Sequence, residues 1–305
     1  MPPSTTSRAR PLPEPGAPEP FAWRFEAIGT AWQIDTAAPL TDAVRAAVRA
    51  RVERFDRAWS RFREDSLVTR IAREPGEHRL PDDAGPLLAL YRVLYEASDG
   101  ALNPLVGRSL EALGYDGRYS LRPRGRAVPA PRWEDAIAWD GERLTTARPV
   151  LLDVGAAGKG HLVDIVLDVL AGHGVTEAVV DASGDIRRRA PAGSIRVALE
   201  HPGDARRAIG VIELGDEAIC ASATNRRRWG AGLHHVLDAT TGLPTRRVLA
   251  SWAIAPTALV ADGVATALFF VEPERLEALQ PFQWVRVLAD GRLEHSPALR
   301  GELFA

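Results

Sequence analysis

A glycine-rich segment with one lysine opens an expected helix at residues 153–164. It reads Asp-Val-Gly-Ala-Ala-Gly-Lys-Gly-His-Leu-Val-Asp, after an apolar, strand-like stretch at 150–152 and before a helical pattern that ends at Gly172. Small residues let a bound group approach the backbone, and a helix N-terminus offers N–H donors with partial positive charge. Lys159 adds a formal charge there. The segment predicts either a phosphate site or an ordinary glycine-rich connection with a solvated lysine.

Neither of two familiar phosphate-binding loops matches this segment. A P-loop places Ser or Thr directly after its Gly-Lys pair, whereas Gly160 follows Lys159 here and the glycine spacing is shorter. A dinucleotide fingerprint reads Gly-x-Gly-x-x-Gly, whereas Gly155, Gly158 and Gly160 are spaced in the reverse order. The segment on its own therefore identifies neither a P-loop enzyme nor a dinucleotide-binding fold.

Asp262 and Thr266 stand four residues apart on an expected helix, so their side chains share one face. A carboxylate and a hydroxyl are hard oxygen ligands, which Mg²⁺ prefers together with waters and substrate phosphates. The same residue types also suit a helix N-cap and a hydroxyl that bonds back to the preceding turn. The spacing therefore predicts either a magnesium site or a capped helix.

His235 is the candidate general base. An unperturbed histidine titrates near neutral pH and can take a proton from a hydroxyl group. The adjacent His234 points the other way if the segment is extended. Asp238 either orients His235 or begins the turn Asp-Ala-Thr-Thr-Gly, and we favour the turn. The alternative is that both histidines are polar loop residues.

Seven segments, in order along the chain, resemble the motifs of one enzyme family. The segment 153–160 is similar to the Asp-x-Gly-x-x-Ala-Lys-Gly motif of the FAD:protein FMN transferases, the ApbE family. The resemblance covers nearly everything after the first two dozen residues. Segment 27–30 resembles Met-Gly-Thr, 59–66 resembles Ser-x-Tyr-x-x-x-Ser, and 99–104 resembles Asp-Gly-Ala-Phe-Asp-Pro. Segment 182–186 resembles Gly-Gly-Asp, 235–244 resembles His-Ile-Ile-Asp-Pro-x-Thr-Gly-x-Pro, and 261–268 resembles Ala-Asp-x-x-x-Thr-Ala-Leu.

The resemblance implies a Mg²⁺-dependent transfer of FMN from FAD to a protein, with AMP as the leaving group. A threonine or serine hydroxyl of a target protein would attack the FMN phosphorus, with His235 as the base. The metal ligands would be Asp262, Thr266 and the carbonyl group of Ala156. The carbonyl group of Ala265 is a further candidate ligand.

The resemblance also implies contacts with the flavin nucleotide. Ile28 and Phe62 stand where family members place apolar and aromatic groups against the isoalloxazine ring. Phe62 also fits the buried stripe of its own expected helix, so a core role competes with stacking. Lys159 would help to neutralise charge on the diphosphate. The implied contact residues are Ile28, Phe62, Ala101, Leu102, Asn103, Asp153, Lys159 and Val236.

Several family positions carry different residues in this chain. Ile28 replaces methionine, Phe62 replaces tyrosine and loses its hydroxyl, and Asn103 replaces an aspartate and loses its charge. Ala156 and Ser183 stand at positions of motif glycines. These departures predict an altered flavin specificity or a divergent target protein.

Two other functions remain open. Water could replace the protein hydroxyl, which would make the chain an FAD pyrophosphatase that yields FMN and AMP. Alternatively, the chain could be a flavin-binding module without turnover. The presence of His235, Asp262 and Thr266 favours an enzyme, whereas Asn103 leaves the binding module open.

The hydrophobic pattern predicts one mixed α/β (α+β) domain with antiparallel-rich sheets and flanking helices. Residues 23–35 are strand-like, and Thr41 can cap a helix whose apolar positions run from Val44 to Phe62. A second helix runs from Pro86 towards residue 97, at a first-turn position for proline. Further strands are expected at 177–181, 194–199, 208–214, 250–254 and 284–288, with an antiparallel hairpin at 194–214.

The composition is that of a globular protein. The chain is 46% hydrophobic and 26% charged, near the globular average. Its net charge of −2 creates no strong field for nucleic acid or an anionic membrane, so neither is expected as a partner. Cys220 is the single cysteine, which excludes an internal disulfide and predicts a small core residue.

The first 21 residues are rich in proline and lack hydrophobic periodicity, so they predict a disordered tail before a domain at 22–305. No apolar region follows the early arginines, so a secretory signal is not expected. No stretch is long and apolar enough to span a bilayer, and no membrane anchor is evident. A cytoplasmic location is therefore expected, with FAD and a target protein as partners.

Overall fold

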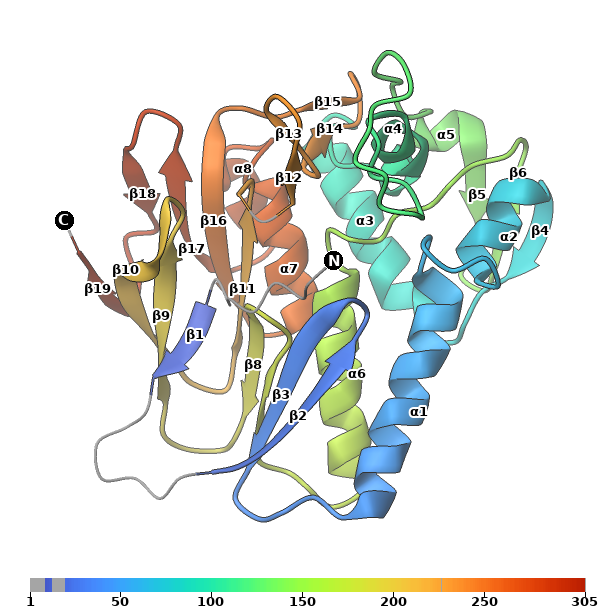
Figure 1. The fold of residues 1–305 in the computed structure, drawn as a ribbon. Coiled ribbons are helices and arrows are strands. Elements are labelled where there is room, and N and C mark those ends of the chain that lie inside the picture. Colours follow the sequence, from blue (N-terminus) through green and yellow to red (C-terminus); the bar gives the residue numbers. More distant parts are fainter. Residues whose placement is uncertain (1–8, 13–19, 226, 305) are drawn as a thin grey trace.

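The structure is a computed structural model that describes residues 9–12, 20–225 and 227–304. Figure 1 shows helices gathered beside a large twisted sheet, and a smaller sheet beyond it. Within these residues the large sheet has eight strands, and every neighbouring pair is antiparallel. In spatial order they are β18 (Leu293–His295), β17 (Gln283–Leu288), β16 (Val248–Ala255), β11 (Ala218–Ala223), β8 (Asp185–Arg189), β7 (Ala178–Asp181), β3 (Thr30–Thr36) and β2 (Phe21–Ala27).

The longer helices cover one face of the large sheet. Their apolar side chains share one core with Ile34 of β3, Cys220 of β11 and Ala253 of β16. These helices are α1 (Asp42–Trp59), α3 (Ala84–Ala97), α6 (Gly158–Gly172) and α7 (Ala258–Ala267). The shorter helical segments are α2 (Leu67–Arg73), η1 (Pro104–Val106), α4 (Gly107–Ala112), α5 (Trp133–Ala136) and α8 (Pro273–Glu277).

The opposite face of the large sheet packs against the smaller, four-stranded sheet. Ile219 of β11 and Trp252 of β16 join Val197 and Ile212 of the smaller sheet in a second core. The strands of this sheet, in spatial order, are β1 (Ala9–Leu12), β9 (Ile195–His201), β10 (Asp204–Leu214) and β19 (Gly301–Leu303). The expected antiparallel hairpin at 194–214 is confirmed as the pair β9 and β10.

β11 separates the two cores, because successive side chains of a strand point to opposite faces. Cys220 faces the helices, and its thiol donates to the carbonyl oxygen of Ala258 at 3.5 Å. Ile219 and Ala221 face the smaller sheet. Cys220 is therefore a buried core residue, as expected, and the prediction of a mixed α/β fold with antiparallel sheets is confirmed.

Short strands join the loops that surround the helix layer. One three-stranded sheet and two small pairs occur in the described residues. Their strands are β4 (Gly76–Arg79), β6 (Arg143–Thr146) and β5 (Ile137–Trp139), then β12 (Arg228–Trp229) with β13 (Leu233–His234), and β14 (Leu237–Asp238) with β15 (Leu243–Pro244).

The helix predicted after Thr41 is confirmed, but it ends earlier than expected. The Thr41 hydroxyl accepts the backbone N–H of Val44 at 3.4 Å, and the buried stripe runs from Val44 to Trp59. Ser60 has an extended backbone, so Phe62 lies in the turn that follows α1. The expectation that Phe62 belongs to the buried stripe of this helix is therefore wrong.

Three other segments differ from the sequence expectations. Residues 23–35 form two strands, because Ile28 and Gly29 both have positive φ and make a tight hairpin turn. The stretch 150–152 is buried but lies in no strand. Within the expected tail, Ala9–Leu12 pairs with β9, so that part is ordered, while residues 1–8 and 13–19 lie outside the described residues.

Among the described helices, none combines the length and the apolar character that a bilayer crossing requires.

His161 makes the stability of the helix layer sensitive to acid. Burial lowers the pKa of His161 to about 4, and its Nε2 lies 2.8 Å from the carbonyl oxygen of Asp83. At pH values between the ordinary histidine pKa and this lowered pKa, the unfolded chain binds the proton and the folded chain does not. The folded state therefore loses stability as the pH falls. This loss amounts to about 3 kcal/mol from pH 7 to pH 4.

Denaturant unfolding of the wild type and of His161→Gln at both pH values measures this loss. A glutamine amide can still donate to Asp83 but does not titrate. Burial raises the pKa of Asp181 to about 6, which opposes the His161 effect, but Asp181 is common to both proteins and cancels. Equal pH dependence in the two proteins would refute the assignment to His161.

Candidate functional site

The glycine-rich segment forms the N-terminal turn of α6. Ala157 occupies the N-cap position and provides no side-chain hydrogen bond. The N–H of Gly158 donates to the carbonyl oxygen of Val154 at 2.7 Å, whereas the N–H of Gly160 needs a partner from another part of the chain. Gly160 approaches α7 closely: a Cβ atom there would lie 2.1 Å from the carbonyl oxygen of Ala258. Glycine is therefore required at this position by the packing of the two helices.

α6 and α7 cap each other. The N–H of Gly160 donates to Asp262 Oδ2 of α7 at 2.9 Å. In return, Asp164 of α6 accepts the N–H groups of Ala258 and Leu259 at 3.0 and 2.8 Å. Each helix thus supplies the carboxylate that satisfies the start of the other, which fixes Asp262 against the glycine-rich segment. Asp262 does cap a helix N-terminus, as one of the two expectations had it, but the helix that it caps is α6 and not its own helix α7.

Thr266 reaches the same segment one turn further along α7. Its hydroxyl lies 3.4 Å from the carbonyl oxygen of Ala156 and 3.0 Å from the Ser222 hydroxyl of β11. Ser251, the cross-strand neighbour of Ser222, donates to the carbonyl oxygen of Ala265 at 2.5 Å. Two strand serines therefore orient this turn of α7, and the Ala265 carbonyl already has a donor.

The oxygens of Ala156, Asp262 and Thr266 suit a magnesium ion. They are a carbonyl, a carboxylate and a hydroxyl, all hard ligands, and Asp262 is 4% exposed. Nowhere in the described residues do three or more His, Cys, Asp or Glu side chains gather in a way that could hold a metal. A site with one carboxylate is typical of Mg²⁺ that is shared with substrate phosphates. The set therefore fits the expected metal.

Lys159 is held by the turn between β7 and β8. Its ammonium group lies 3.1 Å from Asp185 Oδ2 and donates to the carbonyl oxygen of Ala182 at 2.9 Å. Asp185 is fully buried. The solvated-lysine alternative is therefore wrong, and Asp185 is a site residue that the sequence analysis did not single out.

Asp153 connects the glycine-rich segment to two other expected site segments. Its Oδ1 accepts the N–H of Gly155 at 2.8 Å, and its Oδ2 accepts Arg61 Nε at 2.5 Å. Its own N–H donates to the carbonyl oxygen of Pro104 at 2.7 Å. Residues 59–66, 99–104 and 153–160 therefore meet in space.

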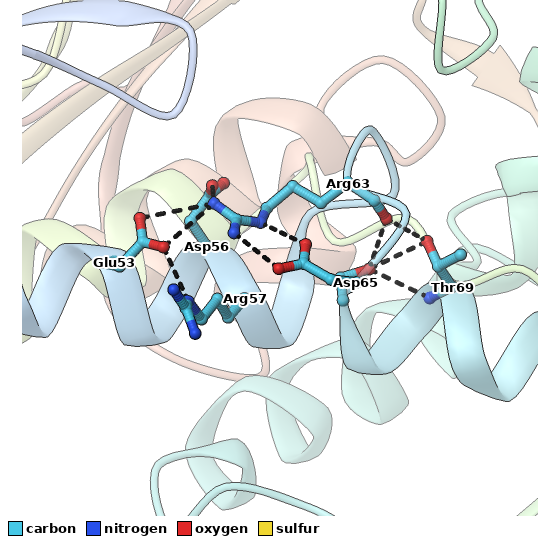
Figure 2. A network of polar contacts seen from close by, with 7 residues as sticks. Glu53, Asp56, Arg57, Arg63, Asp65 and Thr69 are labelled. Carbon is cyan, nitrogen blue, oxygen red and sulfur yellow. Dashed lines mark hydrogen bonds and ion pairs between the residues drawn. The ribbon is translucent and has the colours of Figure 1, made fainter.

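A polar network holds the turn that presents Arg61 and Phe62. Figure 2 shows Arg63 between Asp56 of α1 and Asp65. The guanidinium donates to Asp56 at 3.0 Å and to Asp65 at 2.9 Å. The Thr69 hydroxyl of α2 donates to the Arg63 carbonyl oxygen at 2.7 Å. Ion pairs at exposed positions add little stability, but this set fixes the path of the chain between α1 and α2.

Phe62 belongs to a cluster of four aromatic residues, which we call the aromatic cluster. Phe62 stacks on Tyr119 with ring centroids 4.8 Å apart and an angle of 11°. Tyr115 meets both rings edge-on and stacks on Trp229. Phe62 is half-buried, so its ring packs with these partners instead of with the α1 stripe.

Ile28 lies in the β2–β3 turn with φ +44°. A positive φ is unfavourable for a β-branched residue, and such strain is frequent at functional sites. The turn lies near Lys159: Ser183 donates from its hydroxyl to the Ala31 carbonyl at 2.8 Å, and its own carbonyl oxygen lies 3.4 Å from Lys159 Nζ. Ser183 also has positive φ, at a position where the family motif has glycine.

The segment 101–103 lies partly away from this site. Ala101 accepts the N–H of Ala239 at 2.9 Å, and Leu102 is buried. Asn103 caps η1 by accepting the N–H of Leu105, and its amide donates to the Pro131 carbonyl, both at 2.9 Å. Asn103 also lines a cavity of about 490 Å³, whose wall includes Tyr95, Asp99 and Thr240 but no residue of the expected metal set.

The two histidines have different surroundings. His234 is buried, its Nε2 lies 2.8 Å from the Thr245 carbonyl, and burial lowers its pKa. His235 is half-buried after β13, and its role as the base remains a prediction. The Val236 side chain packs in a small core with Val248 and Phe269. This placement gives no support to the expected contact between Val236 and the flavin.

A sequence model of the ApbE family matches residues 28–287, which is well over half of the chain. The chain belongs to the ApbE family. A protein named FAD:protein FMN transferase from Klebsiella pneumoniae is 26% identical over 277 residues, which cover 84% of this chain and 77% of that protein. One with the same name from Vibrio cholerae is 28% identical over 257 residues, with 78% and 76% covered.

Solved structures agree with this membership. The ApbE protein of Thermotoga maritima superposes with a TM-score of 0.80 at 25% identity, covering 92% of this chain and 97% of that one. The flavin transferase ApbE of Vibrio cholerae has a TM-score of 0.75 at 22% identity, with 92% and 98% covered, and so supports the ApbE fold alone. Arg61 and Asp185 lie within segments that resemble family motifs, but no role was predicted for them, and Ser222 and Ser251 lie outside these segments. All four are candidate site residues because of their contacts in the structure.

Replacing Ile28 tests whether the strained turn of this ApbE-family chain serves flavin binding. Ile28→Asn should weaken FAD binding, because it removes the apolar contact, while the relief of about 1–3 kcal/mol of backbone strain offsets the lost packing. Ile28→Met, which carries the family residue, should keep the affinity. Titration of flavin fluorescence measures both Kd values, and equal affinities in the two variants would exclude Ile28 as a flavin contact.

Proposed function

We propose that this ApbE-family protein transfers the FMN moiety of FAD to a threonine or serine hydroxyl of a target protein and releases AMP. One observation carries the proposal: the oxygens of Ala156, Asp262 and Thr266 meet at the N-terminus of α6. The names of the relatives support the flavin and the protein acceptor. Mg²⁺ and the release of AMP are supported by the donor set and by the chemistry of the substrate.

The mechanism divides the work among a few residues. The N-terminal end of α6 attracts the diphosphate through its partial positive charge, since the N–H groups of Gly158 and Gly160 already donate to Val154 and Asp262. Lys159, oriented by Asp185, adds positive charge. Asp262, Thr266 and the Ala156 carbonyl would hold Mg²⁺, which neutralises charge on the diphosphate when bound. His235 takes the proton of the target hydroxyl as its oxygen bonds to the FMN phosphorus. The bond from that phosphorus to the bridging oxygen breaks, and AMP leaves with the bridging oxygen.

The decisive experiment incubates the purified protein with FAD and Mg²⁺, with and without a threonine-bearing target protein. AMP release and the mass of the target are followed together. A Mg²⁺-dependent mass increase of the target by one FMN moiety supports the transferase. AMP without an adduct would indicate an FAD pyrophosphatase, and tight FAD binding without AMP would indicate a flavin-binding module.

The cytoplasmic location and the domain start at residue 22 stay predictions.

A further inference from the structure

Arg61 is a buried cation whose outer nitrogen atoms lack protein partners. Its side chain is 2% exposed, and its Nε is paired with Asp153 at 2.5 Å. Throughout the part of the chain that the structure describes, no atom accepts a hydrogen bond from Nη1 or Nη2 of Arg61, and both are covered from solvent. Unpaired buried donors are costly and rare, so they call for an explanation such as an acceptor on a ligand.

The surroundings of Arg61 define the kind of ligand. Its Cζ lies 4.2 Å from the centre of the Phe62 ring and 4.8 Å from that of Tyr115, so the guanidinium lies among the aromatic cluster. Tyr119, which is 39% exposed, already stacks on Phe62 at 4.8 Å. The Phe62 ring thus already stacks on one flat ring, and a ligand ring could take that place only if Tyr119 moved. The two Nη atoms of Arg61 suit two acceptors in one plane.

We propose that Arg61 is a specificity residue that binds the carbonyl-bearing pyrimidine edge of the isoalloxazine ring through its Nη atoms. This inference rests on the proposed function and adds a contact that reads the ring rather than the phosphates. A phosphate alone would match the guanidinium fork but would leave the aromatic cluster without a role. A flat heteroaromatic ring with carbonyl groups on one edge uses both.

Two features of the fold prepare this contact. The Arg63 network (Figure 2) holds the turn between α1 and α2. Arg61 and Phe62 belong to this turn, so they are presented together. Asp153 anchors Nε and leaves the fork of Nη atoms for the ligand. Tyr119 has φ +51° and lies at the surface, so its ring is the member of the cluster that moves when a flavin ring takes its place on Phe62.

Binding of riboflavin and of ADP to the full-length protein separates ring from phosphate recognition. Arg61→Met, which keeps the unbranched apolar stem but removes the guanidinium group, should weaken riboflavin binding about 10- to 100-fold, as expected for a lost charge-assisted pair. ADP binding in the presence of Mg²⁺ should be unchanged. Tyr119→Ala should not weaken riboflavin binding. An equal loss of both ligands would mean that Arg61 binds phosphate, and unchanged riboflavin binding would mean that Arg61 is structural. Either result overturns the proposal.

A measurement on the wild type keeps the proposal testable if Arg61→Met does not fold. Riboflavin with sulfur in place of a pyrimidine-edge carbonyl oxygen should bind more weakly than riboflavin, because sulfur is a poorer acceptor. An analogue altered at the benzenoid edge should bind as riboflavin does. The reverse order would contradict the assignment. If the wild type transfers FMN but riboflavin binding does not depend on Arg61, this inference alone is refuted. If riboflavin binding depends on Arg61 but the wild type transfers no FMN, only the proposed function is refuted.

Discussion

Asp262→Asn should lower Mg²⁺-dependent FMN transfer about 10³-fold or more, since the metal's charge stabilisation is worth several kcal/mol. The variant should remain folded, because the amide oxygen of asparagine can still accept the N–H of Gly160. Alanine at this position would instead remove the cap of α6 together with the metal ligand. The asparagine variant therefore separates metal binding from helix capping.

The matched control for this variant is Asp164→Asn. Asp164 is the reciprocal cap, bound to the N–H groups of Ala258 and Leu259, and it pairs with Arg187 at 3.2 Å. Each carboxylate oxygen of Asp164 accepts one of these N–H groups, and asparagine has one acceptor oxygen instead of two. The replacement should therefore cost about 1–2 kcal/mol of unfolding free energy, without removing a metal ligand. AMP release at several Mg²⁺ concentrations, with thermal unfolding alongside, measures both variants. Full activity of Asp262→Asn would overturn the metal assignment.

His235→Ala should lower the rate of FMN transfer about 10²- to 10⁴-fold, the usual contribution of a general base. The Kd for FAD should stay nearly unchanged, because a base that acts on the target hydroxyl has no role in holding the flavin nucleotide. Single-turnover transfer rates and FAD titrations on the same preparation give the two quantities. If both fall by the same factor, His235 is a binding residue.

The neighbouring histidine provides the control for this experiment. His234 is buried and bonded to Thr245, so His234→Ala should lower the free energy of unfolding by about 1–3 kcal/mol through the unpaired carbonyl group. The folded fraction of this variant should still transfer FMN. A loss of stability in His234→Ala and a loss of rate in His235→Ala would assign distinct roles to two adjacent residues of the same type.

Local patterns in the sequence were sufficient for elements whose signals are local. Thr41 and the helical spacing of valines predicted α1, and the short gap between two apolar runs predicted the hairpin of β9 and β10. β8 was missed because Asp-Ile-Arg-Arg-Arg is mostly charged, and its pairing depends on neighbours that are distant in sequence. β11 was missed because it is buried on both faces and shows no alternation.

The site was predictable where residue types alone indicate chemistry, as for the spacing of Asp262 and Thr266. Their partners were not, because these contacts are tertiary: the bond from Gly160 to Asp262 joins residues 102 positions apart. Arg61 was passed over for the same reason, since nothing near it in sequence indicates a buried guanidinium beside Asp153. Lys159 was expected to be solvated or bound to phosphate, and only the fold reveals its buried partner Asp185.

The short strand β1 has a consequence for how the molecule avoids self-association. β1 covers one edge of β9, which would otherwise present unpaired N–H and C=O groups over Ile195–His201. Such an exposed edge can pair with another chain and start aggregation. Pro11 lies within β1 and has no N–H, so β1 is itself a poor template for a further strand. A shortened chain that lacks Ala9–Leu12 would keep every residue of the site but lose this protection.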